Sequence, residues 1–347
     1  MTGLTSVEQG AALSHPRPEI LALTGLRGLA AVAVVASEVG VWRTAPAVLK
    51  DLVAAGALGV PFFFLLSGFV LAYNYPTLSL RSGRRALARF GTARVARLAP
   101  LSLVIGVGVL VLGEVNGMDW VWTVFAAQVW FVGALVLMYC AYPLLARAVP
   151  GSPGKALTVA LGIEVAVLGL RLAAGSGADV WLYRNPLAWV PVFVIGMALA
   201  RFVGLRPPAR TAYLVQAGAA FYAVVVIVLF GSSSAVQYGA VWCVPLGAVI
   251  LSVATAPATP TSSLLAGETL VRLGVISFPL YLLHTIVADG FGSPLSGSLS
   301  YALLAVFWIG VAILIAEGTH RYLGVPSRRW LMNLARRVDR RAASVEA

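Results

Sequence analysis

Two ionisable residues lie in the first long apolar run of the chain. Arg27 and Glu38 are eleven positions apart, so an α-helix returns them to within about 20° of one face, with roughly 16 Å of rise between them. Because an ionisable group costs several kcal/mol in hydrocarbon, such residues usually face the interior of a helix bundle. The pair therefore predicts an interior stripe along which a substrate lies. The alternative places Glu38 at the outer interface, beside Arg43.

A second group of reactive side chains lies in residues 270–290. Tyr281 and His284 are three positions apart and share a helical face, and Ser277 lies one turn earlier. We expect His284 and Glu38 at one depth in the outer half of the membrane. An imidazole suits proton abstraction from an alcohol near neutral pH, whereas glutamate does so only where its surroundings disfavour the carboxylate. A structural role for a single histidine is the alternative.

Other ionisable residues in the apolar runs are expected to form structural ion pairs. These are Glu164 with Arg171, and Glu317 with His320 and Arg321. The two cysteines fall in different apolar runs and indicate small buried side chains. Neither a metal site nor a tightly bound cofactor is predicted.

The composition indicates that lipid is the solvent for most of the chain. Of the 347 residues, 60% are hydrophobic and 11% are charged, against about 25% charged residues in a soluble domain. Ten apolar runs suit a hydrocarbon layer of about 30 Å, and they span residues 20–43, 52–75, 98–116, 119–146, 157–174, 185–203, 212–230, 236–256, 270–290 and 300–323. We therefore predict an all-α polytopic integral membrane bundle of about ten transmembrane helices.

Arginines mark alternate connections between these runs, in residues 81–97, 147–155, 201–210 and 328–341. Such asymmetry places those connections, and both termini, in the cytoplasm. The predicted organisation is an N-terminal tail of residues 1–19, a transmembrane domain of residues 20–326 and a basic tail of residues 327–347. The net charge of +12 then reflects topology and lipid contacts, and no nucleic-acid partner is expected.

Arg94 and Arg97 lie just before the third run enters the membrane at Pro100. Their guanidinium groups match phosphate oxygens. The residues alone leave two roles open, which are contact with lipid headgroups and binding of a phosphate-bearing cosubstrate.

Five blocks in order along the chain resemble the membrane-bound acyltransferase-3 family. They are Leu23–Ala31 (LTGLRGLAA), Phe62–Val70 (FFFLLSGFV), Arg94–Leu101 (RVARLAPL), Phe193–Met197 (FVIGM) and Ser277–His284 (SFPLYLLH). The resemblance implies a ten-helix core that moves an acyl group, commonly from cytoplasmic acyl-CoA, onto a hydroxyl of a sugar, lipid, peptidoglycan or secondary metabolite. It implies that acyl-CoA is the cosubstrate and that substrate or donor is bound by Arg27, Ser67, Arg94, Arg97 and Ser277.

The chain also departs from the pattern of this family. Glu38 stands where the family has a histidine in the first helix, and Leu135 lies where a carboxylate is expected. Val192 and Gly324 likewise replace residues that are commonly acidic. The scaffold is kept while most of the usual acid–base set is replaced, which leaves Glu38, His284 and Tyr281 as the expected catalytic residues.

Three functions remain open at this stage. The first is O-acyl transfer to a lipophilic small molecule or secondary metabolite, with Glu38 as the general base. The second uses the same fold for donor-free acid–base chemistry on a natural product, such as cyclisation, dehydration or spiroketal closure. The third is a transporter or accessory protein. The Ala, Gly, Val and Arg content is typical of a GC-rich bacterium, so we expect the bacterial cytoplasmic membrane, with membrane lipids as further partners.

The predicted topology can be tested with reporter fusions. Reporters joined after residue 80 or residue 341 should read cytoplasmic, because arginines flank both positions, and one joined at residue 116 should read outside. Paired alkaline phosphatase and green fluorescent protein fusions measure this. A cytoplasmic signal at residue 116 contradicts the ten-helix assignment.

Overall fold

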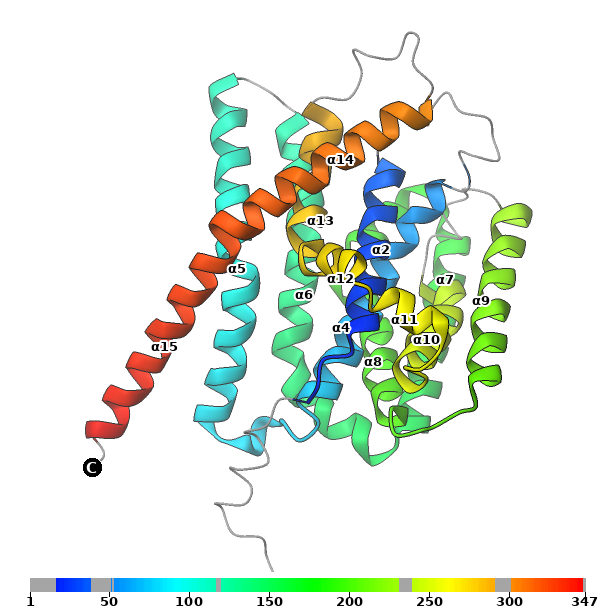
Figure 1. Ribbon diagram of the computed structural model, residues 1–347, viewed down its shortest axis with the longest axis horizontal. Coiled ribbons are helices and arrows are strands. Elements are labelled where there is room, and N and C mark those ends of the chain that lie inside the picture. Colours follow the sequence, from blue (N-terminus) through cyan, green and yellow to red (C-terminus); the bar gives the residue numbers. More distant parts are fainter. Residues whose placement is uncertain are drawn as a thin grey trace, which may run out of the picture.

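The computed structural model describes residues 17–38, 51, 53–116, 120–230, 239–290 and 301–345. Within these ranges the protein is made of helices and turns, without strands (Figure 1). The first half contains α2 (Leu21–Glu38), η2 (Ala55–Leu58), α4 (Gly59–Asn74), η3 (Leu80–Ser82), α5 (Arg84–Asn116), α6 (Trp120–Gly151) and α7 (Pro153–Arg184). The second half contains η4 (Pro186–Trp189), α8 (Val190–Leu199), η5 (Ala200–Phe202), α9 (Ala209–Phe230), α10 (Gly239–Thr255), α11 (Pro260–Leu265), α12 (Glu268–Val275), α13 (Ser277–Gly290), α14 (Tyr301–Thr319), the π-helical η7 (His320–Gly324) and α15 (Val325–Val345).

The arrangement confirms an all-α membrane bundle, whereas the number of crossings stays a prediction. Six helices of the described ranges are long and apolar enough to span a membrane, and two shorter apolar helices cover Pro186–Phe202 and Gly239–Thr255. The expected single run at 270–290 is instead broken at Ile276 into α12 and α13. Proline is the physical reason, because the ring of Pro279 has no N–H and crowds the carbonyl four residues earlier.

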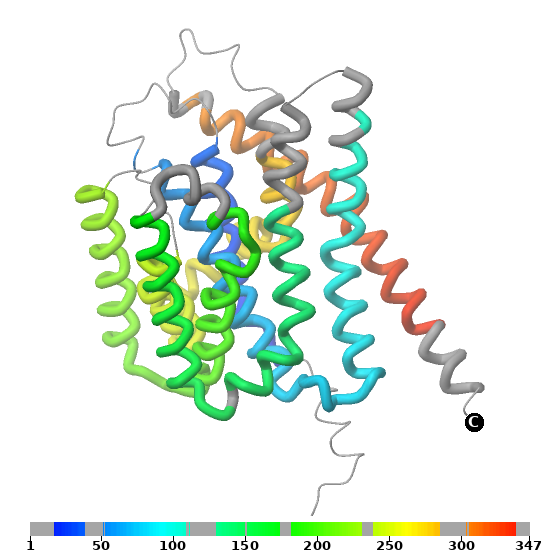
Figure 2. The backbone as a smooth tube through the Cα atoms, turned by 180° about the vertical axis from the view of Figure 1, so that it is seen from behind, coloured from blue at the N-terminus to red at the C-terminus, as the bar shows by residue number. Residues whose placement is uncertain are grey.

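Helix α4 lies at the centre of the bundle. Its sequence is apolar on every side, and twelve of its sixteen residues are buried, as expected for a helix surrounded by others. It packs most extensively against α8, and α2 packs against α12, α13 and α4. Helix α9 is equally apolar but has only two buried residues, and both views place it at the edge of the bundle (Figures 1 and 2). Lipid therefore covers the apolar surface of α9 that no other helix buries.

Glycines set the closest helix contacts, and two of them face each other between α4 and α8. A Cβ on Gly68 would lie 2.0 Å from the carbonyl oxygen of Phe193, and one on Gly196 would lie 1.9 Å from the carbonyl oxygen of Leu65. Small residues let transmembrane helices approach this closely. Both glycines belong to blocks that carry the family resemblance, so packing explains why these blocks contain glycine.

The chain ends in a long oblique helical segment. Helix α14 continues through the π-helical turn into α15, which packs against α5 at an oblique angle and then extends away from the bundle (Figures 1 and 2). The expected boundary between residues 326 and 327 falls inside α15, so the basic tail begins as part of this helix.

Replacing Gly68 with alanine should destabilise the protein, because the added methyl overlaps the backbone of α8. Overpacking of this kind costs about 1–3 kcal/mol, so thermal unfolding in detergent should shift down by several degrees. Gly218→Ala in α9 is the matched control, since a Cβ there meets nothing within 4 Å. Equal unfolding temperatures for the two variants would contradict this packing.

Candidate functional site

Arg27 is the buried cation on which the site is built. Its Nε and Nη2 atoms donate to the carbonyl oxygen of Gly274 at 3.0 and 2.6 Å. That carbonyl lies at the end of α12 and also accepts a hydrogen bond from Ser277 Oγ at 2.8 Å. A guanidinium has five N–H donors, so those that do not bind this carbonyl remain for a ligand. The break between α12 and α13 thus positions the arginine.

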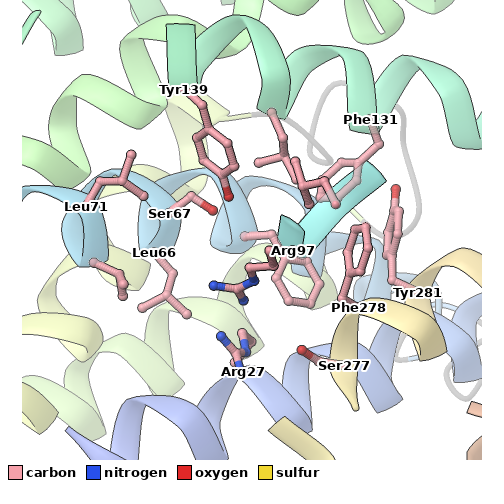
Figure 3. Close-up of a pocket in the computed structure, with 14 residues that line it drawn as sticks. Arg27, Leu66, Ser67, Leu71, Arg97, Phe131, Tyr139, Ser277, Phe278 and Tyr281 are labelled. Atoms are coloured by element: carbon pink, nitrogen blue, oxygen red, sulfur yellow. The ribbon is translucent and has the colours of Figure 1, made fainter. Parts of the chain in front are cut away.

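An internal cavity of about 60 Å³ opens beside Arg27. Its polar lining comes from five elements and consists of Arg27 on α2, Ser67 on α4, Arg97 on α5, Tyr139 on α6, and Ser277 and Tyr281 on α13. The guanidinium groups of Arg27 and Arg97 face each other, and the hydroxyl ends of Tyr139 and Ser67 point into the same space (Figure 3). Two adjacent cations repel in a low-dielectric interior, so an anion between them is stabilised.

Two open clefts meet this cavity at the arginine-rich end of the bundle. One, of about 840 Å³, lies between the N-terminal segment, α4 and the first turns of α5. The other, of about 780 Å³, lies between α5, α13 and α15. Arg27 and Arg97 line both clefts and the internal cavity. They therefore stand at the junction of all three spaces.

Arg94 lines both clefts and is held by aromatic residues. Its Nη2 donates to the Tyr75 hydroxyl at 3.2 Å, and its guanidinium carbon lies 5.5–5.8 Å from the ring centroids of Tyr75, Phe90 and Tyr139. Its Nε atom is buried and has no hydrogen-bond partner among the described residues. A buried donor of this kind favours a bound acceptor, and the aromatic cage keeps it in place.

Tyr281 and His284 lie together on α13, as predicted. The Tyr281 ring packs against Phe131, with centroids 4.2 Å apart, and against Phe63 at 5.9 Å. His284 is buried, and its Nδ1 hydrogen-bonds to the carbonyl oxygen of Tyr281. A carbonyl can only accept, so Nδ1 carries the proton and Nε2 of the neutral ring keeps its lone pair. His284 therefore presents a basic nitrogen, although it does not line the internal cavity.

Glu38 is the last residue of α2 and is exposed. It lies outside the cavity lining. The connection that follows it, residues 39–50, lies outside the described ranges. The structure thus brings the predicted Arg27, Ser67, Arg97, Ser277 and Tyr281 to one cavity and leaves Glu38 and His284 outside its lining.

The sequence interpretation missed two cavity residues on α6, Tyr139 and Phe131. Both fall in the block from Trp130 to Tyr139, which was considered only for the carboxylate missing at Leu135. Leu135 itself lines the cavity and is buried. Helical spacing was the available signal, because positions 131, 135 and 139 share one face.

One of the two expected structural ion pairs has a different partner from the one predicted. The side-chain partner of Glu317 is Arg272, whose Nε donates to Glu317 Oε2 at 2.9 Å and whose Nη2 contacts Oε1. This pair joins α12 to α14, whereas His320 and Arg321 act on Glu317 through charge. The sequence interpretation did not pair Arg272, because the two residues are 45 positions apart. Glu164 and Arg171 are both buried on α7 and interact electrostatically.

These features define a membrane-embedded enzyme with a buried polar cavity that opens to arginine-lined clefts. A sequence model described as an acyltransferase domain, Acyl_transf_3, matches residues 20–317. The chain therefore belongs to the acyltransferase-3 family. It is 26% identical over 366 residues to acyltransferase MdmB of Streptomyces mycarofaciens. This match covers 89% of this chain and 92% of that protein. No solved structure matches the chain.

Proposed function

We propose that the protein is an O-acyltransferase of the bacterial cytoplasmic membrane, which transfers an acyl group from a CoA-type thioester to a hydroxyl of a lipophilic small molecule. The observation that carries this proposal is the junction at Arg27 and Arg97. A phosphate-bearing donor binds in the arginine-lined cleft between α4 and α5, and its thioester end passes this junction into the cavity. The family provides the reaction class.

The proposed reaction needs one base and conserves every proton. A general base removes the proton from the acceptor hydroxyl, and the oxygen attacks the thioester carbonyl. The tetrahedral intermediate then collapses, the carbon–sulfur bond breaks, and the protonated base returns its proton to the leaving thiolate. We assign the base to Glu38, with His284 and Tyr281 orienting the acceptor. The Ser67 hydroxyl lines the cavity and is assigned as a donor for the carbonyl oxygen, whereas the Ser277 hydroxyl already donates to the Gly274 carbonyl.

One observation favours a second candidate, which is donor-free acid–base chemistry on a natural product. The wall of the cavity is apolar at Leu135, where the family is expected to carry a carboxylate. A reaction that needs only one proton-transferring carboxyl, such as a cyclisation, would tolerate this loss. Release of free thiol from acetyl-CoA by the purified protein, with and without candidate acceptors, separates the two candidates.

Replacing Arg94 and Arg97 together with alanine should raise the KM for the donor by at least about a hundredfold, because each charge-assisted phosphate contact contributes about 1.5–3 kcal/mol. Steady-state kinetics with varied acyl-CoA measures this. Arg147→Ala combined with Arg206→Ala removes the same charge outside the clefts and should leave KM unchanged. Unchanged donor kinetics in a folded Arg94/Arg97 variant favours the donor-free candidate.

Replacing Glu38 with glutamine should lower kcat by at least about a hundredfold, since a positioned acid or base contributes about 10²–10⁴-fold. The amide keeps the shape of the side chain but cannot exchange a proton, so substrate binding and the unfolding temperature should persist. Glu38→His restores the residue of the family and should retain activity if acyl transfer is native. Wild-type turnover in Glu38→Gln refutes this assignment, and His284→Gln then tests the remaining base.

A further inference from the structure

Helix α15 exposes arginines and large apolar side chains on different sides. Arg328, Arg329 and Arg336 are exposed and line the cleft between α15 and α5. At 100° per residue, Trp330 and Leu334 fall on the other side of the helix, where they are 65% and 45% exposed. The arginines are thus accessible to a ligand in the cleft, and the exposed apolar side suits a lipid surrounding.

The arginines of α15 do not face acidic partners across this cleft. The opposite wall carries Arg94 and Arg97 from α5, and Arg27 lies at the inner end. Among the lining residues that the structure describes, the carboxylate is Glu19. Six guanidinium groups therefore share one cleft with one carboxylate. Their mutual repulsion is relieved by an anion, for which guanidinium forks are well suited.

The remaining lining indicates that the anion is part of an amphiphile. Leu101, Phe278, Pro279 and Met332 form an apolar surface within the same cleft. Beyond it, α5 exposes Leu103, Val104 and Val107, which are 65%, 51% and 57% exposed. The cleft of about 780 Å³ therefore opens between lipid-facing surfaces of two helices. A soluble phosphate compound would use the arginines but not this apolar flank.

We propose that the cleft between α5 and α15 binds the phosphate headgroup of an anionic phospholipid of the cytoplasmic leaflet. The phosphate lies among Arg328, Arg329 and Arg336, and the acyl chains lie over the apolar surface of α5. Arg329 and Arg336 line this cleft but not the one between α4 and α5. The lipid site is thus testable without changing the arginines assigned to the donor.

The test uses purified full-length protein in detergent, titrated with phosphatidylglycerol or with phosphatidylcholine. Lipid adducts are counted by native mass spectrometry, and thermal unfolding is followed in parallel. Phosphatidylglycerol should bind and raise the unfolding temperature, and phosphatidylcholine should do neither. Arg329→Gln combined with Arg336→Gln should weaken the apparent affinity for phosphatidylglycerol by about thirtyfold at low salt. Each arginine near an anionic lipid surface strengthens binding by about five- to sixfold, and the two factors multiply.

Arg206→Gln combined with Arg210→Gln is the matched control, because both residues are exposed and line neither cleft. This variant loses the same charge and should bind phosphatidylglycerol like the wild type. Equal weakening in both double variants reduces the effect to net charge and overturns the site. Failure of phosphatidylglycerol to bind or to stabilise the protein overturns it as well, whether or not free coenzyme A stabilises the protein, because coenzyme A is assigned to the cleft between α4 and α5.

Discussion

The bond between Arg27 and the Gly274 carbonyl is the constraint on which the cavity depends. A guanidinium inside a membrane protein must find acceptors or remain costly, and a carbonyl at a helix break supplies one. The approach needs glycine on both helices, because a Cβ on Gly28 would lie 2.6 Å from the Gly274 nitrogen. A Cβ on Gly274 would lie 1.9 Å from the carbonyl oxygen of Thr24. The glycines of the sequence therefore allow the close packing of α2 on α12, and this packing brings the Gly274 carbonyl to the guanidinium of Arg27.

The break between α12 and α13 leaves the Gly274 carbonyl available to side-chain donors. A continuous helix over residues 270–290 would use the Gly274 carbonyl in its own ladder of backbone hydrogen bonds. Pro279 has no N–H for the Val275 carbonyl, the helix breaks at Ile276, and the Gly274 carbonyl accepts from Arg27 and Ser277. The same proline turns α13, so that Ser277 and Tyr281 reach the cavity. Pro279 lowers the stability of the helix locally, and the resulting break positions the side chains of Arg27, Ser277 and Tyr281.

The sequence predicted the positions of the helices better than the contacts between them. Long apolar runs and their flanking arginines are local signals, so the helices at α2, α4 and α9 follow from them. The blocks around Gly68 and Gly196 were recognised, but their mutual contact needs the packing of α4 on α8. Tyr139 was missed because its one local signal, a helical face shared with Phe131 and Leu135, does not show that this face lines a cavity. The arginine face of α15 was interpreted as a tail, since no sequence signal places it against α5.

A layer of three aromatic rings forms one wall of the cavity. Phe63, Phe131 and Tyr281 contact one another, with centroids 4.2–6.3 Å apart. On one side lie Arg27, Arg97 and the open clefts. The rings line the end of the cavity away from these clefts, and His284 follows Tyr281 by one turn of α13.

Tyr281 connects the cavity to His284. Its side chain lines the cavity, and its carbonyl oxygen accepts a hydrogen bond from His284 Nδ1. Under the proposed mechanism, the donor reaches the layer from the arginines while the base stands beyond it. The acyl group and the acceptor hydroxyl then meet at Tyr281. Aromatic packing stabilises this part of the core by about 0.5–1.5 kcal/mol per pair, so the contacts of Phe63 and Phe131 with Tyr281 hold in place the wall at which the proposed reaction occurs.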